Sequence, residues 1–174
     1  MGIPRRPEKV KLITGLLFQH QEIYSAARGA LVRIFGKIDF ESEPMDFTHT
    51  SYYAGEMGLA LKRRFLGFER LRGLDGIYAV KLKTNRLERL LAKGANRAVN
   101  IDPGYLSLSK VALFSTKDYS HRVYLNKGIF CEITLFYRGN TFNPWPWTYP
   151  DYRTKEYLSI FNDMRERYKT RIRA

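Results

Sequence analysis

The sequence contains one cysteine, three histidines and no long apolar segment, and each of these shortages excludes a class of protein. Because Cys131 has no second cysteine to pair with, no internal disulfide can form, and we expect a cytoplasmic protein. The histidines are far apart and no cysteine pair accompanies them, so the sequence predicts no metal site. No stretch is long and apolar enough to cross a bilayer.

The chain also lacks the glycine-rich loops that commonly hold nucleotide phosphates. Neither G-x-x-x-x-G-K-[ST] nor G-x-G-x-x-G after a strand occurs anywhere in it. No other signature of a known reaction is present. The sequence therefore identifies neither a reaction nor a cofactor.

Positive charge is what the chain has in excess. Thirty Lys and Arg residues against 17 Asp and Glu give a net charge of +13. Such an excess favours nucleic acid, nucleotides, other phosphorylated ligands or anionic membrane surfaces as partners. The 174 residues include 44% hydrophobic ones and no linker, which predicts one globular domain over residues 1–174.

The hydrophobic pattern of the first half predicts strands and helices in alternation. Residues 11–18, "KLITGLLF", are nearly all apolar, as in a central strand covered on both faces. Apolar residues then recur at helical spacing over 23–34, and Gly36 is placed to end that helix. Residues 37–43 alternate like a strand, while the middle of the segment 37–72 is compatible with strand or helix.

A second strand–helix pair is predicted after this segment. Residues 76–83 alternate with Tyr78, Val80 and Leu82 on one face. Asn85 and Glu88 have the spacing of a capping box at the start of a helix. The resulting β-α-β-β-α-β order fits the ferredoxin-like arrangement.

The second half predicts mainly antiparallel strands. Asp-Pro-Gly at 102–104 has the composition of a turn. Strands over 105–115, 120–125 and 129–137 would then form a three-stranded meander. A C-terminal helix begins after Thr154 as its N-cap. The predicted fold is thus a single α+β domain with a mostly antiparallel sheet.

Lys110 is the first candidate for a functional side chain. If 105–115 is one strand, Lys110 shares a face with apolar Leu108 and Ala112. An amine in such surroundings loses hydration and could bind phosphate or act as a general base. The alternative is that Lys110 lies at the sheet margin and extends its ammonium group into water.

The hairpin around "NKG" (126–128) supplies a second candidate group. A three-residue loop closed by Gly128 would place Leu125 opposite Ile129 and Val123 opposite Cys131. In the same register Arg122 is opposite Glu132. These two would share a polar face with Tyr124 and Thr134, either to orient a ligand or as an ordinary solvated surface.

His121 and Cys131 fall on the opposite face of this predicted hairpin. An imidazole beside a thiol suggests a nucleophile, although a lone cysteine among aliphatic residues is usually a small core residue. His121 and Asp102 are therefore weak catalytic candidates, as are Lys110 and Glu132.

The segment "NPWPWTYPDY" (143–152), here called the strap, precedes the C-terminal helix. Its prolines stiffen an extended crossing, and its large rings can cover the sheet or bind a ligand. We expect Trp147 and Tyr149 to anchor the strap. Asp151, Tyr152 and Arg153 lie at the expected helix entrance, where backbone N–H groups favour anions, and are candidate ligand-binding residues.

The strap resembles a known family when it is taken with several other stretches. These stretches are "SYYAGEMG", "KTNRLE", "DPGYLSLSK" and "WTYPDYR". The resemblance is to the prokaryotic domain of unknown function family numbered forty-four sixteen, and it covers nearly the whole chain. It implies a single compact domain and no assigned catalytic residue. Members are sometimes labelled GTP-binding, a label that the missing phosphate loops do not support here.

Three functions are compatible with these observations. The favoured one is binding of an anionic partner, RNA or a nucleotide-like small molecule, because the sequence combines basic residues with aromatic residues that could stack on bases. The second is an enzyme that acts on a phosphorylated or carboxylated substrate in a pocket around Lys110, Arg122 and Glu132. The third is a basic protein-interaction module.

Overall fold

The computed structural model describes residues 2–48, 50, 52–92, 94 and 96–173. The helices are α1 (Gln21–Phe35), α2 (Ala54–Met57), α3 (Ala79–Leu91), the short 3-10 helix η1 (Asp151–Arg153) and α4 (Lys155–Arg173). The strands are β1 (Lys11–Phe18), β2 (Ile38–Glu41), β3 (Met45–Asp46), β4 (Lys62–Phe68), β5 (Val99–Leu106), β6 (Lys110–Ser115), β7 (Val123–Asn126), β8 (Ile129–Arg138) and β9 (Thr141–Pro144).

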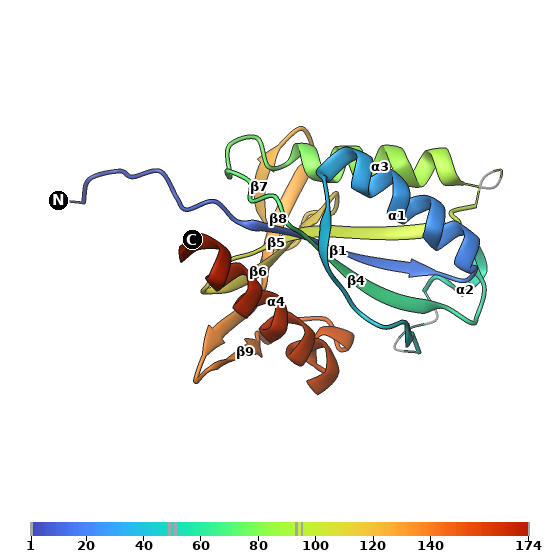
Figure 1. Cartoon of the computed structure of the whole chain (residues 1–174). Helices are drawn as coiled ribbons and strands as arrows, with labels where there is room; N and C mark the ends of the chain where they lie inside the picture. The colour runs from blue at the N-terminus through green and yellow to red at the C-terminus, as the bar shows by residue number, and fades with distance from the viewer. Residues whose placement is uncertain (1, 49, 51, 93, 95, 174) are drawn as a thin grey trace.

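The strands of the described residues form one antiparallel sheet with the order β2-β4-β1-β5-β6-β8-β7. β3 pairs with β4 and β9 with β8, off this path. α1 and α3 lie side by side on one face, and α4 crosses the other (Figure 1). The order β2-β4-β1-β5, with α1 and α3 as crossovers, is the predicted ferredoxin-like arrangement. The α+β, mostly antiparallel prediction is confirmed.

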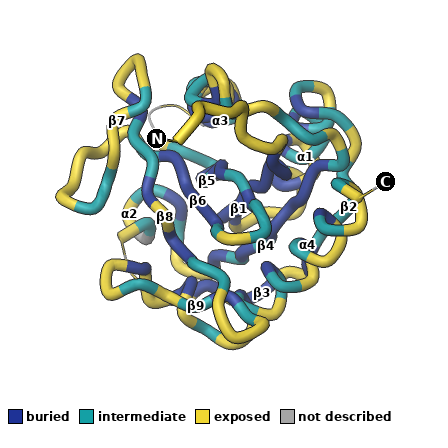
Figure 2. The backbone as a smooth tube through the Cα atoms, turned by 90° about the vertical axis from the view of Figure 1, so that its left-hand side faces the viewer, coloured by how far each residue is buried: buried dark blue, intermediate teal, exposed yellow. Residues whose placement is uncertain are grey.

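The two larger of the apolar clusters formed by the described residues lie on the two faces of the sheet. Under α1 and α3, residues such as Leu16, Leu31 and Phe68 are fully buried. Under α4, Phe65 and Phe161 are packed edge to face, with ring centroids 5.0 Å apart. β1 is buried along its whole length, as predicted from its continuous apolar run (Figure 2).

The predicted strand at 76–83 is wrong, because its second half is the beginning of α3. The buried face of this helix includes Lys81, Thr84 and Glu88, whose polar side chains hide the helical period in the sequence. Asn85 lies inside α3 and does not cap it. The third strand of the ferredoxin-like unit is instead β4, from the segment that the sequence left undecided.

The Asp-Pro-Gly turn is also wrong, because all three residues lie inside β5. A Cβ on Gly104 would lie 2.1 Å from the Ala112 carbonyl oxygen of β6, so glycine here permits close contact between strands. The chain reverses later, at 107–109, where Ser107 N–H donates to the Lys110 carbonyl oxygen over 2.9 Å. The predicted strand 105–115 is therefore two strands.

The three strands predicted to form a meander correspond to β6, β7 and β8, which are antiparallel but have a different order. β8 lies between β6 and β7, which makes β7 an edge strand. The predicted pair Val123 and Cys131 is confirmed, whereas Ile129 pairs with Asn126 instead of Leu125. The cause is an irregularity between Tyr124 and Asn126 that shifts the register by one residue.

The C-terminal helix follows its prediction. The Tyr157 N–H donates to Thr154 Oγ1 over 3.3 Å, which is the expected N-cap contact. Phe161, Met164 and Tyr168 are buried on the face that covers the sheet. Among the described residues, no helix combines the length and the apolar character that a membrane span requires.

Candidate functional site

A fork in the sheet between β5 and β6 opens the space for a site. β5 pairs with β1 along its whole length but with β6 only at Gly104–Leu106. The Ile101 N–H donates to Glu88 Oε1 over 2.5 Å, and Lys81 Nζ donates to the Ile101 carbonyl oxygen over 3.0 Å. Residues two apart in a strand direct their backbone groups to the same edge, so the backbone nitrogen of Pro103, like that of Ile101, is on the edge toward β6. Pro103 has no N–H and cannot donate a hydrogen bond to β6 there. Two side chains of α3 thus replace the missing strand partner.

The fork holds a cavity of about 570 Å³, here called the fork cavity. Its wall combines β4, β5, β6, β8, α3, the strap and the segment before α2. Five cationic side chains line it: Arg63, Lys81, Arg97, Lys117 and Arg122. Three carboxylates line it as well: Asp102, Glu132 and Asp151. Its volume is in the range of sites for small molecules.

Arg63 is a buried cation of the cavity wall, with 3% of its side chain exposed. Its Nη1 donates to Asp102 Oδ2 over 3.0 Å, and its Nη2 donates to Asp151 Oδ2 over 3.4 Å. To reach β5 from β4, the guanidinium crosses β1 at Gly15, where a Cβ would lie 2.8 Å from Nη1. The glycine in the central strand therefore makes room for the ion pair.

These contacts set the charge of Asp102. Burial is the largest single influence on this carboxyl and raises its pKa, but the charges of Arg63 and Lys81 act in the opposite direction. Hydrogen bonds from Arg63 and from Asn100 Nδ2, at 2.9 Å, lower it further. The net pKa of Asp102 lies below its ordinary value, so it is a carboxylate at neutral pH and holds Arg63 in place.

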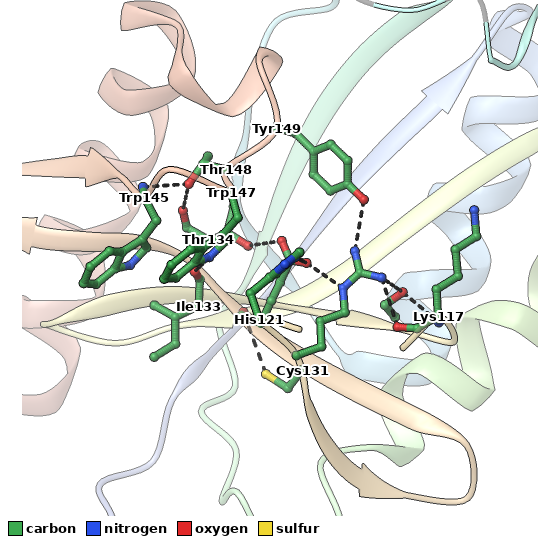
Figure 3. A network of polar contacts seen from close by, with 12 residues as sticks. Lys117, His121, Cys131, Ile133, Thr134, Trp145, Trp147, Thr148 and Tyr149 are labelled. Carbon is green, nitrogen blue, oxygen red and sulfur yellow. Dashed lines mark hydrogen bonds and ion pairs between the residues drawn. The ribbon is translucent and has the colours of Figure 1, made fainter. Parts of the chain in front are cut away.

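Arg122 and Glu132 form the predicted ion pair, and it is buried. Arg122 Nε donates to Glu132 Oε2 over 2.7 Å, with 3% and 2% of the two side chains exposed. The other guanidinium nitrogens donate over 3.0 Å to Ser115 Oγ, the Lys117 carbonyl oxygen and the Tyr149 hydroxyl (Figure 3). Arg122 thereby ties the loop after β6 to the strap.

The predicted contact between His121 and Cys131 is wrong. His121 Nε2 lies 3.2 Å from Glu132 Oε2, and consecutive residues of β8 point to opposite faces, so the imidazole and the thiol are on opposite sides. Burial, and then the charge of Glu132, raises the pKa of Cys131 to about 12. A thiol with this pKa is protonated and weakly nucleophilic at neutral pH.

His121 instead belongs to a column of aromatic rings. It stacks between Tyr119 and Trp147, with centroid distances of 5.9 and 5.8 Å. Trp147 stacks in turn on Trp145 at 5.1 Å, with the ring planes 6° apart (Figure 3). The column fixes the first half of the strap against the loop before β7.

The strap is attached to the sheet and also forms part of the cavity wall. Thr148 Oγ1 donates to the Thr134 carbonyl oxygen over 2.6 Å, which attaches the strap to β8. Arg153 donates to the carbonyl oxygens of Thr148 and Pro146, at 2.6 and 2.7 Å, and so holds the strap in its bend. Tyr149, by contrast, lies on the wall of the cavity.

Lys117, which follows β6, and Tyr52, which precedes α2, contact each other at the cavity wall. Lys117 Nζ lies 5.0 Å from the centre of the Tyr52 ring and 3.4 Å from its hydroxyl. Arg97 holds the adjacent α2 through Glu56, with Nη2 and Oε2 2.6 Å apart. Within the described residues, neither Lys117 nor Lys81 has a carboxylate oxygen within 4.0 Å, whereas the three arginines of the cavity each do.

The structure brings five of the predicted site residues together on the cavity wall: Asp102, Arg122, Glu132, Asp151 and Tyr152. It places the others elsewhere. Lys110 begins β6 opposite Phe136, Tyr124 is exposed on the edge strand, and neither lines the cavity. His121 contacts the cavity residue Glu132, and Arg153 contacts the strap at Thr148, but neither His121 nor Arg153 lines the cavity.

Four cationic residues of the cavity, Arg63, Lys81, Arg97 and Lys117, were not predicted as site residues from the sequence. Lys81 lies in the segment that was predicted to be a strand, so its position could not be found. Arg63 does have a signal, because it alternates with Phe65 in "KRRFLGF" and must share its buried face. In the described part of the chain, no three His, Cys, Asp or Glu side chains come together as a group that could hold a metal ion.

Comparison with known proteins identifies the family but no activity. The family described as "Domain of unknown function (DUF4416)" matches residues 8–168. The chain belongs to the DUF4416 family. The matched residues include every element from β1 to the greater part of α4, so the fork cavity lies wholly within the DUF4416 domain. No curated protein and no solved structure matches the chain.

Proposed function

We propose that this protein binds an anionic small molecule of about nucleotide size in the fork cavity. The observation that carries the proposal is the pair of ammonium groups on the cavity wall, Lys81 and Lys117, that have no carboxylate oxygen within 4.0 Å among the described residues. Lys81 is 8% exposed and uses one of its three N–H groups on the Ile101 carbonyl oxygen. A buried charge is costly unless it is paired, so an anion in the cavity would stabilise it.

The aromatic residues of the wall support a ligand with a planar ring. Tyr52, Tyr53, Phe114 and Tyr149 line the cavity with the lysines. Tyr52 is 64% exposed and Tyr149 49% exposed, so each ring has a face available for stacking. Stacking of one base on such a ring contributes roughly 1–3 kcal/mol.

The alternative partner, RNA, has less support from the arrangement of charges. In the basic run at 61–65, Arg64 contacts Glu41 at 3.0 Å and Lys62 contacts Asp46 at 2.5 Å. These cations are already partly neutralised by the protein. The unpaired ammonium groups of the site lie on the wall of a concave cavity, a shape that suits small molecules better than a polymer.

The proposal is tested by identifying the bound molecule and then perturbing Lys117. Protein purified from its native host, with and without ribonuclease treatment, is analysed by mass spectrometry, and the molecule found is measured against Lys117→Gln by calorimetry. We expect mass spectrometry to find an anionic small molecule that ribonuclease treatment does not remove. The Kd of Lys117→Gln for this molecule should be roughly tenfold or more higher than that of the wild type, as expected for the loss of one charge-assisted hydrogen bond.

Lys83→Gln is the matched control, because Lys83 is exposed on α3 and does not line the cavity. Its Kd should equal that of the wild type. Recovery of RNA that ribonuclease removes, or equal Kd values for the Lys117 variant and the control, would refute the proposal.

A further inference from the structure

A second hollow adjoins the fork cavity and shares part of its wall. It has a volume of about 430 Å³ and lies along the C-terminal half of α3. Four residues line both spaces: Lys81, Arg97, Asn100 and Thr116. A ligand that reaches these residues from the fork cavity therefore has room to continue.

The two spaces differ in chemistry. Aromatic residues line the fork cavity, whereas no described aromatic residue lines the second hollow. Among the described residues, the second hollow has three cationic side chains, Lys81, Arg89 and Arg97, and one carboxylate, Glu88. Glu88 Oε1 already accepts the Ile101 N–H, and Arg97 is paired with Glu56. Because Arg97 is paired with Glu56, Lys81 and Arg89 outnumber the single carboxylate, Glu88, among the described residues of the hollow.

Lys81 lies at the junction of the two spaces. It is buried, and its Nζ is held in the fork by the Ile101 carbonyl oxygen at 3.0 Å. Arg89 is two helical turns further along the same helix, is exposed, and has no side-chain hydrogen bond within the described residues. The two cations are thus arranged in line, from the inner wall toward solvent.

We infer that the ligand is a nucleoside phosphate or a molecule of the same plan, with its ring in the fork cavity and its anionic tail running past Lys81 into the second hollow toward Arg89. This inference rests on the proposed function and adds the direction of the ligand and the site of its tail. A chain of phosphates fits a space lined by cations and amides without rings, because it offers charge and acceptors but no surface for stacking.

The experiment compares the four common ribonucleosides with their mono- and triphosphates by calorimetry on the whole protein. We expect the affinity of the wild type to rise from nucleoside to monophosphate to triphosphate. Arg89→Gln should weaken the triphosphate about fivefold or more and leave the nucleoside unchanged, as expected for one lost charge-assisted contact. Arg86→Gln is the control, because Arg86 is exposed on α3 and lines neither space.

Lys81→Met extends the test to the junction. It should weaken the monophosphate and the triphosphate alike, by roughly tenfold or more, since both place a phosphate at the junction. If the loss of the Ile101 contact prevents this variant from folding, Arg89→Gln decides alone.

The outcomes separate the two proposals. If the three forms of a nucleoside bind equally well, or if Arg89→Gln weakens the nucleoside as much as the triphosphate, the direction of the ligand is refuted while small-molecule binding stands. If neither nucleosides nor nucleotides bind to the wild type, the inference is refuted. The proposed function then fails as well if mass spectrometry finds no other anionic small molecule.

Discussion

Replacing Arg63 with methionine would show how strongly the site and the fold depend on one buried ion pair. Methionine keeps an unbranched apolar stem but removes the cation that contacts Asp102 at 3.0 Å and Asp151 at 3.4 Å. It also removes the guanidinium from the Phe47 ring, whose centre is 5.1 Å away. Removing one partner of a buried pair typically costs about 3–5 kcal/mol, because a buried charge is left uncompensated.

The loss is measured as the free energy of unfolding in urea, extrapolated to water. A domain of this kind has a total stability of about 5–15 kcal/mol, so the expected loss is a large fraction of it. Lys62→Met is the matched control, since Lys62 is the preceding residue of β4 and pairs with Asp46 where both are exposed. An exposed pair contributes about 0–1 kcal/mol.

The pH dependence gives a second and independent readout. In the wild type the pKa of Asp102 is lowered, so its contribution is present above the ordinary value near pH 4 and is lost as the pH falls through the lowered pKa. Without the charge and the hydrogen bond of Arg63, the pKa of Asp102 should be higher than in the wild type. The difference in stability between wild type and variant should then shrink as the pH falls from 7 toward 5.

Two results would contradict this reasoning. A loss no larger than that of Lys62→Met would mean that the Arg63 pair contributes no more than an exposed one. A difference in stability that stays constant between pH 7 and pH 5 would mean that Asp102 does not become the uncompensated charge.

Two further predictions follow from the strands and from the thiol. Gly104→Ala should destabilise the protein more than Gly2→Ala, because a Cβ at 104 lies 2.1 Å from the Ala112 carbonyl oxygen and Gly2 has open space; equal urea midpoints would contradict the close contact. Cys131 should resist iodoacetamide at pH 8 until the protein is unfolded, because its pKa is raised to about 12; rapid labelling of the native protein, followed by mass spectrometry, would contradict its burial.

The elements that could be predicted are those whose pattern is local. β1 is a continuous apolar run, α1 and α4 have regular apolar faces, and Thr154 is an ordinary N-cap. Val123 pairs with Cys131 as predicted, although Asn126 instead of Leu125 pairs with Ile129 and an irregularity lies between these two pairs. In each case, residues close in sequence decide the structure.

The predictions were wrong where a residue lies in an environment that is unusual for its type. Lys81 and Glu88 are polar, yet they are buried because they satisfy the unpaired backbone of Ile101 in another element. Pro103 and Gly104 have the composition of a turn, yet they lie in a strand, where one ends a ladder and the other permits a close contact. Such uses depend on partners that are distant in sequence.

The sequence by itself determined the class of the domain, the excess of positive charge, the ion pair of Arg122 with Glu132 and several residues of the cavity. It did so because these follow from composition, period and short-range register. Only the tertiary structure decided where the site is, because the fork forms where α3 replaces β6 beside β5. It also decided which cations are available for the proposed ligand, since the partners of Arg63 and Arg97 come from other elements, whereas Lys81 and Lys117 have no carboxylate oxygen within 4.0 Å among the described residues.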